Sequence, residues 1–133
     1  MIIDFRVRPP YKSYLEAVMF KNLPRSKGFS QRLGMPQAPS VAELSLEKML
    51  LEMCEAGITK AVIPGRMANP AFGRVKNEDI QELLEQHPEI FIGFAGIDPS
   101  EKNALQTIEQ LVVNGPFQGI VMEPGVLERP IYA

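Results

Sequence analysis

The chain has little of the chemistry that would define its class at once: one cysteine, one histidine and no tryptophan among 133 residues. Cys54 has no second cysteine to pair with, which excludes an internal disulfide and a disulfide-stabilised scaffold. Because Cys54 follows Met53 on an apolar helical stripe, we expect a buried thiol and a reducing, cytoplasmic compartment.

A strong charge excess and long apolar runs are also missing. The net charge of −2 and the pI near 5.5 leave no basic surplus for nucleic acid or anionic lipid, so neither partner is expected. No run approaches the ~18 apolar residues of a membrane span, and the first residues do not resemble an export signal. With 45% hydrophobic residues, the chain has enough apolar side chains for one domain over residues 1–133.

What is present is an alternation of strand and helix patterns. Strands are predicted at residues 2–8, 58–64, 90–97 and 119–124, and helices at 11–20, 41–56, 77–87 and 99–113. Short links between them imply a parallel α/β sheet with right-handed crossovers. The four strands would make about half of a (β/α)8 barrel, because a complete barrel needs about 250 residues. A doubly wound sheet fits the bare pattern too, but no Gly-x-Gly-x-x-Gly follows the first strand.

Local signals mark the expected helix ends. Ser40, Asn77 and Asp98 are typical helix-capping residues at the predicted starts, and Gly57, Pro88 and Gly115 stand at the predicted ends. The long connection 9–40 carries a single acidic residue and five basic ones, which are Lys12, Lys21, Arg25, Lys27 and Arg32. Connections of this length are often functional, and a lid is one interpretation.

The first ten residues, Met1-Ile2-Ile3-Asp4-Phe5-Arg6-Val7-Arg8-Pro9-Pro10, are the most informative stretch. Alternation places Asp4, Arg6 and Arg8 on one face of a strand. The stretch resembles the opening strand of the amidohydrolase barrels, in particular the decarboxylase-like amidohydrolase 2 family, in which an apolar run and Asp precede His-x-His. The resemblance implies a TIM-barrel-like fold, with its site at the barrel mouth, and a metal-dependent hydrolase or decarboxylase acting on small carboxylated substrates.

Arginine replaces both histidines of that motif. A guanidinium stays protonated and has no lone pair for a metal, so Arg6 and Arg8 do not support the usual metal chemistry. In the family, the remaining histidine ligand and the catalytic aspartate come from about the fifth and eighth strands. A divalent metal such as Zn is therefore expected only if ligands come from outside this chain.

Charged residues at the predicted strand ends are the candidate site, since active sites of parallel barrels lie there. Arg6 and Arg8, with Arg66 after the second strand, are predicted to bind the carboxylate or phosphate of a small anionic ligand. The alternative is a solvated strand face and a solvated loop arginine. Glu123, at the end of the fourth strand, is the candidate general base, and its alternative role is ion-pair partner of Arg6 or Arg8.

The two other titratable candidates are weaker. Asp98 is expected to cap the following helix, and His87 lies at a helix end without further metal-ligand residues nearby.

The resemblance favours an enzyme, a hydrolase or carboxy-lyase whose metal site is degraded in this half. The alternative is a non-catalytic anion-binding or regulatory half barrel. Because a half barrel leaves two sheet edges and an apolar face uncovered, we expect a homo-oligomer, unless the chain is a shortened form of a longer product.

Overall fold

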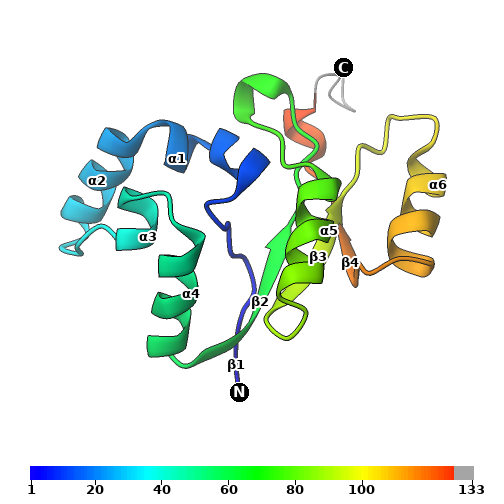
Figure 1. The fold of residues 1–133 in the computed structure, drawn as a ribbon. Coiled ribbons are helices and arrows are strands. Elements are labelled where there is room, and N and C mark those ends of the chain that lie inside the picture. Colours follow the sequence, from blue (N-terminus) through cyan, green and yellow to red (C-terminus); the bar gives the residue numbers. More distant parts are fainter. Residues whose placement is uncertain (128–133) are drawn as a thin grey trace.

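The computed structural model describes residues 1–127, which form a four-stranded sheet with helices (Figure 1). All neighbouring strands are parallel and lie in chain order, which confirms the predicted α/β fold. In register, Ile3 faces Lys60 and Ala61 faces Phe91. The strands are β1 (Ile2–Asp4), β2 (Ile58–Pro64), β3 (Phe91–Gly96) and β4 (Gly119–Val121).

The two outer strands are shorter than predicted, and each has a local cause. The chain bends directly after β1, although the Val7 N–H still donates to the Val62 carbonyl at 2.9 Å and keeps the segment beside β2. β4 ends at Val121, and Pro124, which has no backbone N–H, begins the short 3₁₀ turn η4 (Pro124–Val126). The predicted strand bounds therefore extend beyond the hydrogen-bonded strands at both edges of the sheet.

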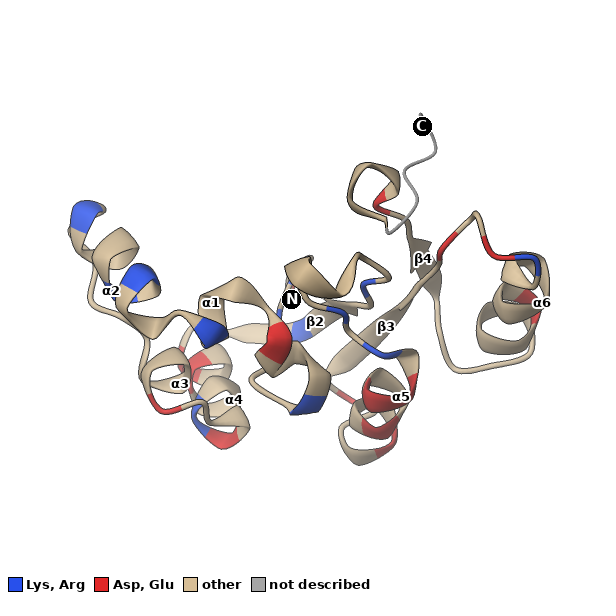
Figure 2. Cartoon of the chain, turned by 90° about the horizontal axis from the view of Figure 1, so that it is seen from above, with Lys and Arg blue, Asp and Glu red and all other residues tan. Residues whose placement is uncertain are grey.

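Three helices follow one another along one side of the sheet, α4 (Leu46–Glu55), α5 (Asn77–Gln86) and α6 (Ala104–Ile108) (Figure 2). A π-helical turn, η3 (Glu109–Val113), continues α6. Gly57, at φ 71°, lies just beyond the C-cap of α4, as predicted from its tolerance of the left-handed region. None of the helices among residues 1–127 is long and apolar enough to span a bilayer.

The long connection is mostly helical, which differs from the prediction of one short helix and a loop. It contains η1 (Lys12–Glu16), α1 (Val18–Lys21), α2 (Leu23–Arg32) and α3 (Pro39–Ala42). The expected helix at 11–20 breaks at Ala17, whose ψ of 142° is extended. α2 has a regular start, because the Asn22 side chain accepts from the Arg25 N–H and Pro24 lies in the first turn.

The predicted caps need correction because their side chains find other partners. Ser40 lies inside α3, where its N–H and hydroxyl donate to Glu52, and Ser45 caps α4 in its place. Asn77 is buried and bonds to β3, so Lys76 takes the N-cap position of α5. Asp98 accepts from Ser100 in a tight turn, and α6 begins only at Ala104.

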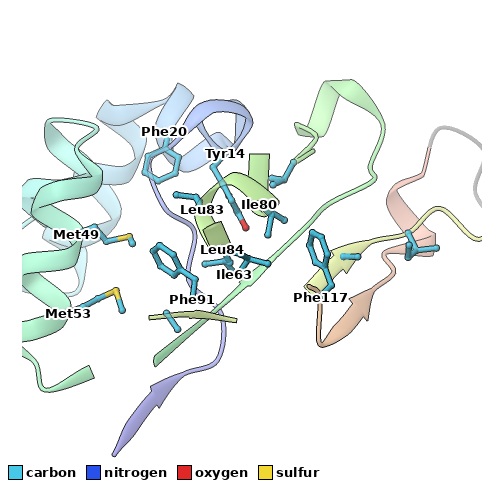
Figure 3. Close-up of a cluster of buried hydrophobic side chains, with 14 residues drawn as sticks. Tyr14, Phe20, Met49, Met53, Ile63, Ile80, Leu83, Leu84, Phe91 and Phe117 are labelled. Carbon is cyan, nitrogen blue, oxygen red and sulfur yellow. The ribbon is translucent and has the colours of Figure 1, made fainter. Parts of the chain in front are cut away.

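The core lies where the sheet meets α4, α5 and the first turns of the connection (Figure 3). Tyr14, Ile63, Ile80 and Leu83 are fully buried there. The expectation of a buried thiol is wrong, since Cys54 is exposed while Met53 takes the inward position beside it. One residue along a helix turns the side chain by about 100°, enough to move it out of the core. His87 packs edge-on against Phe91.

Candidate functional site

The carboxyl ends of the strands bring the four candidate residues together. Arg6 and Arg8, Arg66 after β2 and Glu123 after β4 all line one small hollow. Arg6 and Arg8 share it although the chain bends between β1 and Val7. The site thus joins residues up to 117 positions apart.

Glu123 is held by two of the three guanidinium groups. Its Oε1 accepts from Arg6 Nη2 at 3.3 Å, and its Oε2 accepts from Arg66 Nε at 2.7 Å. Arg66 also donates from Nη1 to the Phe72 carbonyl at 2.7 Å, which fixes the plane of its fork. The Arg66–Glu123 pair is the better shielded, with side-chain exposures of 24% and 22%, whereas the Arg6 side chain is 60% exposed. This geometry favours the ion-pair interpretation of Glu123, because neither carboxylate oxygen is left without a donor.

Arg8 is the exception in the cluster. It is half-buried, and among residues 1–127 its side chain forms no hydrogen bond or ion pair. Burial lowers the pKa of Arg8, and the positive charges of Arg6 and Arg66 lower it further, with Glu123 opposing them. Three guanidinium groups and one carboxylate leave the cluster a net charge of 3 − 1 = +2. The hollow therefore presents a charged fork without a partner in the part of the chain that the structure describes.

A close contact between strand ends positions Arg66. Gly65 lies against Gly96 so tightly that a Cβ on Gly65 would be 2.4 Å from the Gly96 nitrogen. The Asn77 amide bonds to both backbone groups of Gly96, accepting from its N–H at 2.8 Å and donating to its C=O at 3.0 Å. Since Arg66 follows Gly65 directly, this contact fixes where its side chain begins.

Tyr14 supports the floor of the site and was missed by the sequence analysis. Its ring is fully buried, and its hydroxyl donates to the Pro64 carbonyl at 2.8 Å, at the end of β2. Burial raises the pKa of Tyr14 far above its ordinary value, with the nearby charge of Arg8 opposing the shift. The sequence predicted only a helix over residues 11–20, and nothing in it indicated the contact of Tyr14 with β2.

The donor set does not fit a metal ion. No cluster of three or more His, Cys, Asp or Glu side chains occurs in the part of the chain that the structure describes. At the strand ends, Arg6 and Arg8 have no lone pair to offer, and Glu123 is engaged by arginines. His87 packs on Phe91, and Asp98 bonds within its own turn. What these residues can do is hold an anion.

Comparison with known proteins identifies a similar solved structure. No protein-family model matches the chain, and no curated protein does. Among solved structures, an uncharacterized Tim-barrel protein from Bordetella bronchiseptica aligns with 98% of this chain, with a TM-score of 0.83 and 32% sequence identity. The fold is half of a TIM barrel. The chain spans 46% of the length of that protein.

The half barrel has two free sheet edges in the described part of the chain, because β1 and β4 each have a neighbour on one side only. Apolar side chains stand next to these edges: Ile3 is 46% exposed, Phe5 69% and Met122 46%. In a TIM barrel the first and fourth strands each pair with a further strand. The arginine-lined hollow therefore lies at the carboxyl ends of the strands of an open sheet.

Proposed function

We propose that this half barrel binds a small carboxylate, or an anion of similar shape, at the ends of its strands. The observation that carries the proposal is Arg8, a half-buried guanidinium with no partner among residues 1–127. An unpaired cation in such a place is unfavourable, and a bound anion would relieve it. A guanidinium fork matches a carboxylate with two parallel hydrogen bonds, which favours a planar anion.

The resemblance of the first strand to the amidohydrolase 2 family supports a more specific version, in which the bound carboxylate belongs to a substrate. In this version the chain is an amidohydrolase-like hydrolase or carboxy-lyase with a degraded metal site. Glu123 is the candidate base, because it lines the same hollow as Arg8. A metal would have to be held by ligands from outside this chain.

A non-catalytic, regulatory anion site is the second candidate. Its support is the engagement of both Glu123 oxygens by Arg6 and Arg66, which leaves no free base in the hollow. The two candidates share the anion site and differ only in turnover. To separate them, the wild type and the Glu123→Gln variant are each incubated with a carboxylated substrate. Chromatography then measures how much of the substrate is lost.

Calorimetry with citrate and phosphate tests the shared proposal. Arg8→Gln is expected to weaken binding by about 1.5 to 3 kcal/mol, the size of a charged hydrogen bond, or roughly 10- to 150-fold. Arg32→Gln removes the same charge from the exposed end of α2 and is the matched control. If wild type binds neither anion, or if both variants bind alike, the arginines are structural and the proposal fails.

A further inference from the structure

We propose that the ligand of this site is an amphipathic carboxylate, whose head binds Arg8 and whose aliphatic tail lies in an apolar cup formed by the connection after β1. This inference rests on the proposed anion site and adds the second half of the ligand. Two observations support it, which are the shape of the cup and the residues that it shares with a hollow beside the arginines.

The cup lies among α1, α2 and α3, which stand together at one end of the molecule (Figure 1). Its volume is about 530 Å³, within the usual range for small-molecule sites. The apolar side chains that line it are unusually exposed for their size, with Phe29 at 64%, Leu33 at 58% and Met35 at 60%. Arg25 and two serines, Ser26 and Ser30, add polar groups to its lining.

A second, smaller hollow lies beside the arginines and has two lining residues in common with the cup. It has a volume of about 180 Å³ and is lined by Arg8 and Arg66 together with Ala17, Val18 and Met19. Val18 and Met19 also line the cup, so the two spaces share one wall. A carboxylate between Arg8 and Arg66 would thus have its first methylene groups against Val18 and Met19. The charged groups lie at the smaller hollow and the apolar surface at the cup, which is the distribution of an aliphatic acid.

Gln37 places an unpaired amide in the wall of the cup, since its side-chain nitrogen is buried without a hydrogen-bond partner in the described part of the chain. Buried polar groups are nearly always paired, and an unpaired one calls for an explanation such as a ligand or a water. The aliphatic tail has no acceptor for this donor, so a water held in the cup beside the tail would satisfy it.

A second copy of the chain is the competing occupant of the cup. The charge distribution favours the acid, because α2 itself carries three basic residues and no acidic one (Figure 2). Two copies meeting at this surface would bring like charges together, which is unfavourable. An anionic ligand meets no such repulsion, because the positive charges of α2, Arg8 and Arg66 all attract its carboxylate.

Calorimetry with butyrate and octanoate on the same protein tests the proposal. Each buried methylene group is worth about 0.8 kcal/mol, close to fourfold in affinity, so four additional groups with partial burial should tighten binding at least tenfold. Leu33→Ser is expected to remove most of this gain and to leave butyrate binding unchanged. Leu51→Ser is the matched control, because Leu51 is exposed to the same 58% on α4 and lies outside the cup.

The possible results separate this inference from the proposed function. Equal affinities for butyrate and octanoate would overturn the tail site and leave the anion site standing. If the Arg8→Gln variant binds octanoate as tightly as wild type does, the tail adsorbs without any contact between the head and Arg8. That result would also overturn the inference. No binding of citrate, butyrate or octanoate would end both proposals. If Leu33→Ser lowers the solution mass in light scattering while octanoate affinity is unchanged, the cup is an interface between copies and the inference is wrong.

Discussion

Replacing Asn77 by alanine should destabilise the fold far more than a typical substitution at the first turn of a helix. Asn77 is only 8% exposed, and its amide makes the two hydrogen bonds to the Gly96 backbone. Truncation leaves a buried N–H and a buried C=O unpaired, and each such group costs about 1 to 3 kcal/mol. With partial compensation by water, we expect a loss of about 2 to 4 kcal/mol, against total stabilities of roughly 5 to 15 kcal/mol.

Urea unfolding followed by circular dichroism measures this loss as a shift of the midpoint at constant slope. Glu78→Ala is the control, because Glu78 is the next residue of α5 and is exposed, so its removal should change stability by less than about 0.5 kcal/mol. Because Arg66 follows Gly65, which lies against Gly96, the alanine variant should also bind anions more weakly. If the two variants unfold at the same urea concentration, the Asn77 amide does not hold the strand ends together.

Asn77→Asp adds a pH test with a definite sign. The carboxylate can still accept from the Gly96 N–H, but it would face the Gly96 carbonyl without a proton to donate. Burial beside a carbonyl should raise the pKa of the new carboxyl group in the folded state above the ordinary value of about 3.9. Its contribution to stability is then fully present below the unfolded pKa and is lost as pH rises through the folded pKa. We therefore expect this variant to approach wild-type stability in mild acid and to be weakest at neutral pH. A stability difference from wild type that is constant from pH 4 to pH 8 would refute this account.

Three further predictions concern other parts of the site. Tyr14→Phe leaves the Pro64 carbonyl without its donor and should cost about 1 to 2 kcal/mol, measured by urea unfolding; in wild type, the raised pKa means that Tyr14 should stay protonated above pH 10 and resist spectrophotometric titration until the protein unfolds. We also propose that the free edges of β1 and β4 drive self-association, with an interface on the order of 2,000 Å². Light scattering at micromolar concentration tests this, and a stable monomer would argue against it. Finally, the double variant Arg6→His with Arg8→His should gain no tight Zn binding by calorimetry, since two imidazoles leave a tetrahedral site half empty.

The sequence predicted the order and direction of the strands well, because that information is local. Apolar runs and helical periodicity are properties of neighbouring residues, and they located β2, β3 and α5 to within one position at each end. The single helix predicted at 41–56 is wrong, because the structure divides this range into α3 and α4. α2 was missed although Asn22 and Pro24 are a regular helix start. Its apolar residues, such as Phe29, are exposed on the cup, so the helix lacks the buried stripe on which such predictions depend.

The candidate site was predicted as a set of residues but not as a set of contacts. The rule that parallel strands present their carboxyl ends together was sufficient to group Arg6, Arg8, Arg66 and Glu123. It could not indicate which arginines Glu123 would hold, because that depends on contacts across 57 and 117 positions. Asn77 was misread as a cap for the same reason. Its partner is 19 residues further along the chain, and only the packed sheet brings the two together.

The charge excess at the strand ends connects the stability of the fold to ligand binding. Arg8 is half-buried beside two other guanidinium groups, and Glu123 neutralises only one of the three charges. Such an arrangement destabilises the empty protein, so a fold optimised for stability alone would place a neutral side chain at this position. Arg8→Met should therefore make the empty protein slightly more stable while weakening its anion binding. In wild type, an anion at 100 times its dissociation constant should add about 2.7 kcal/mol to the free energy of unfolding. A citrate-dependent rise of the melting temperature that disappears in Arg8→Met would link both effects to one side chain, whereas an equal rise in both proteins would place the anion elsewhere.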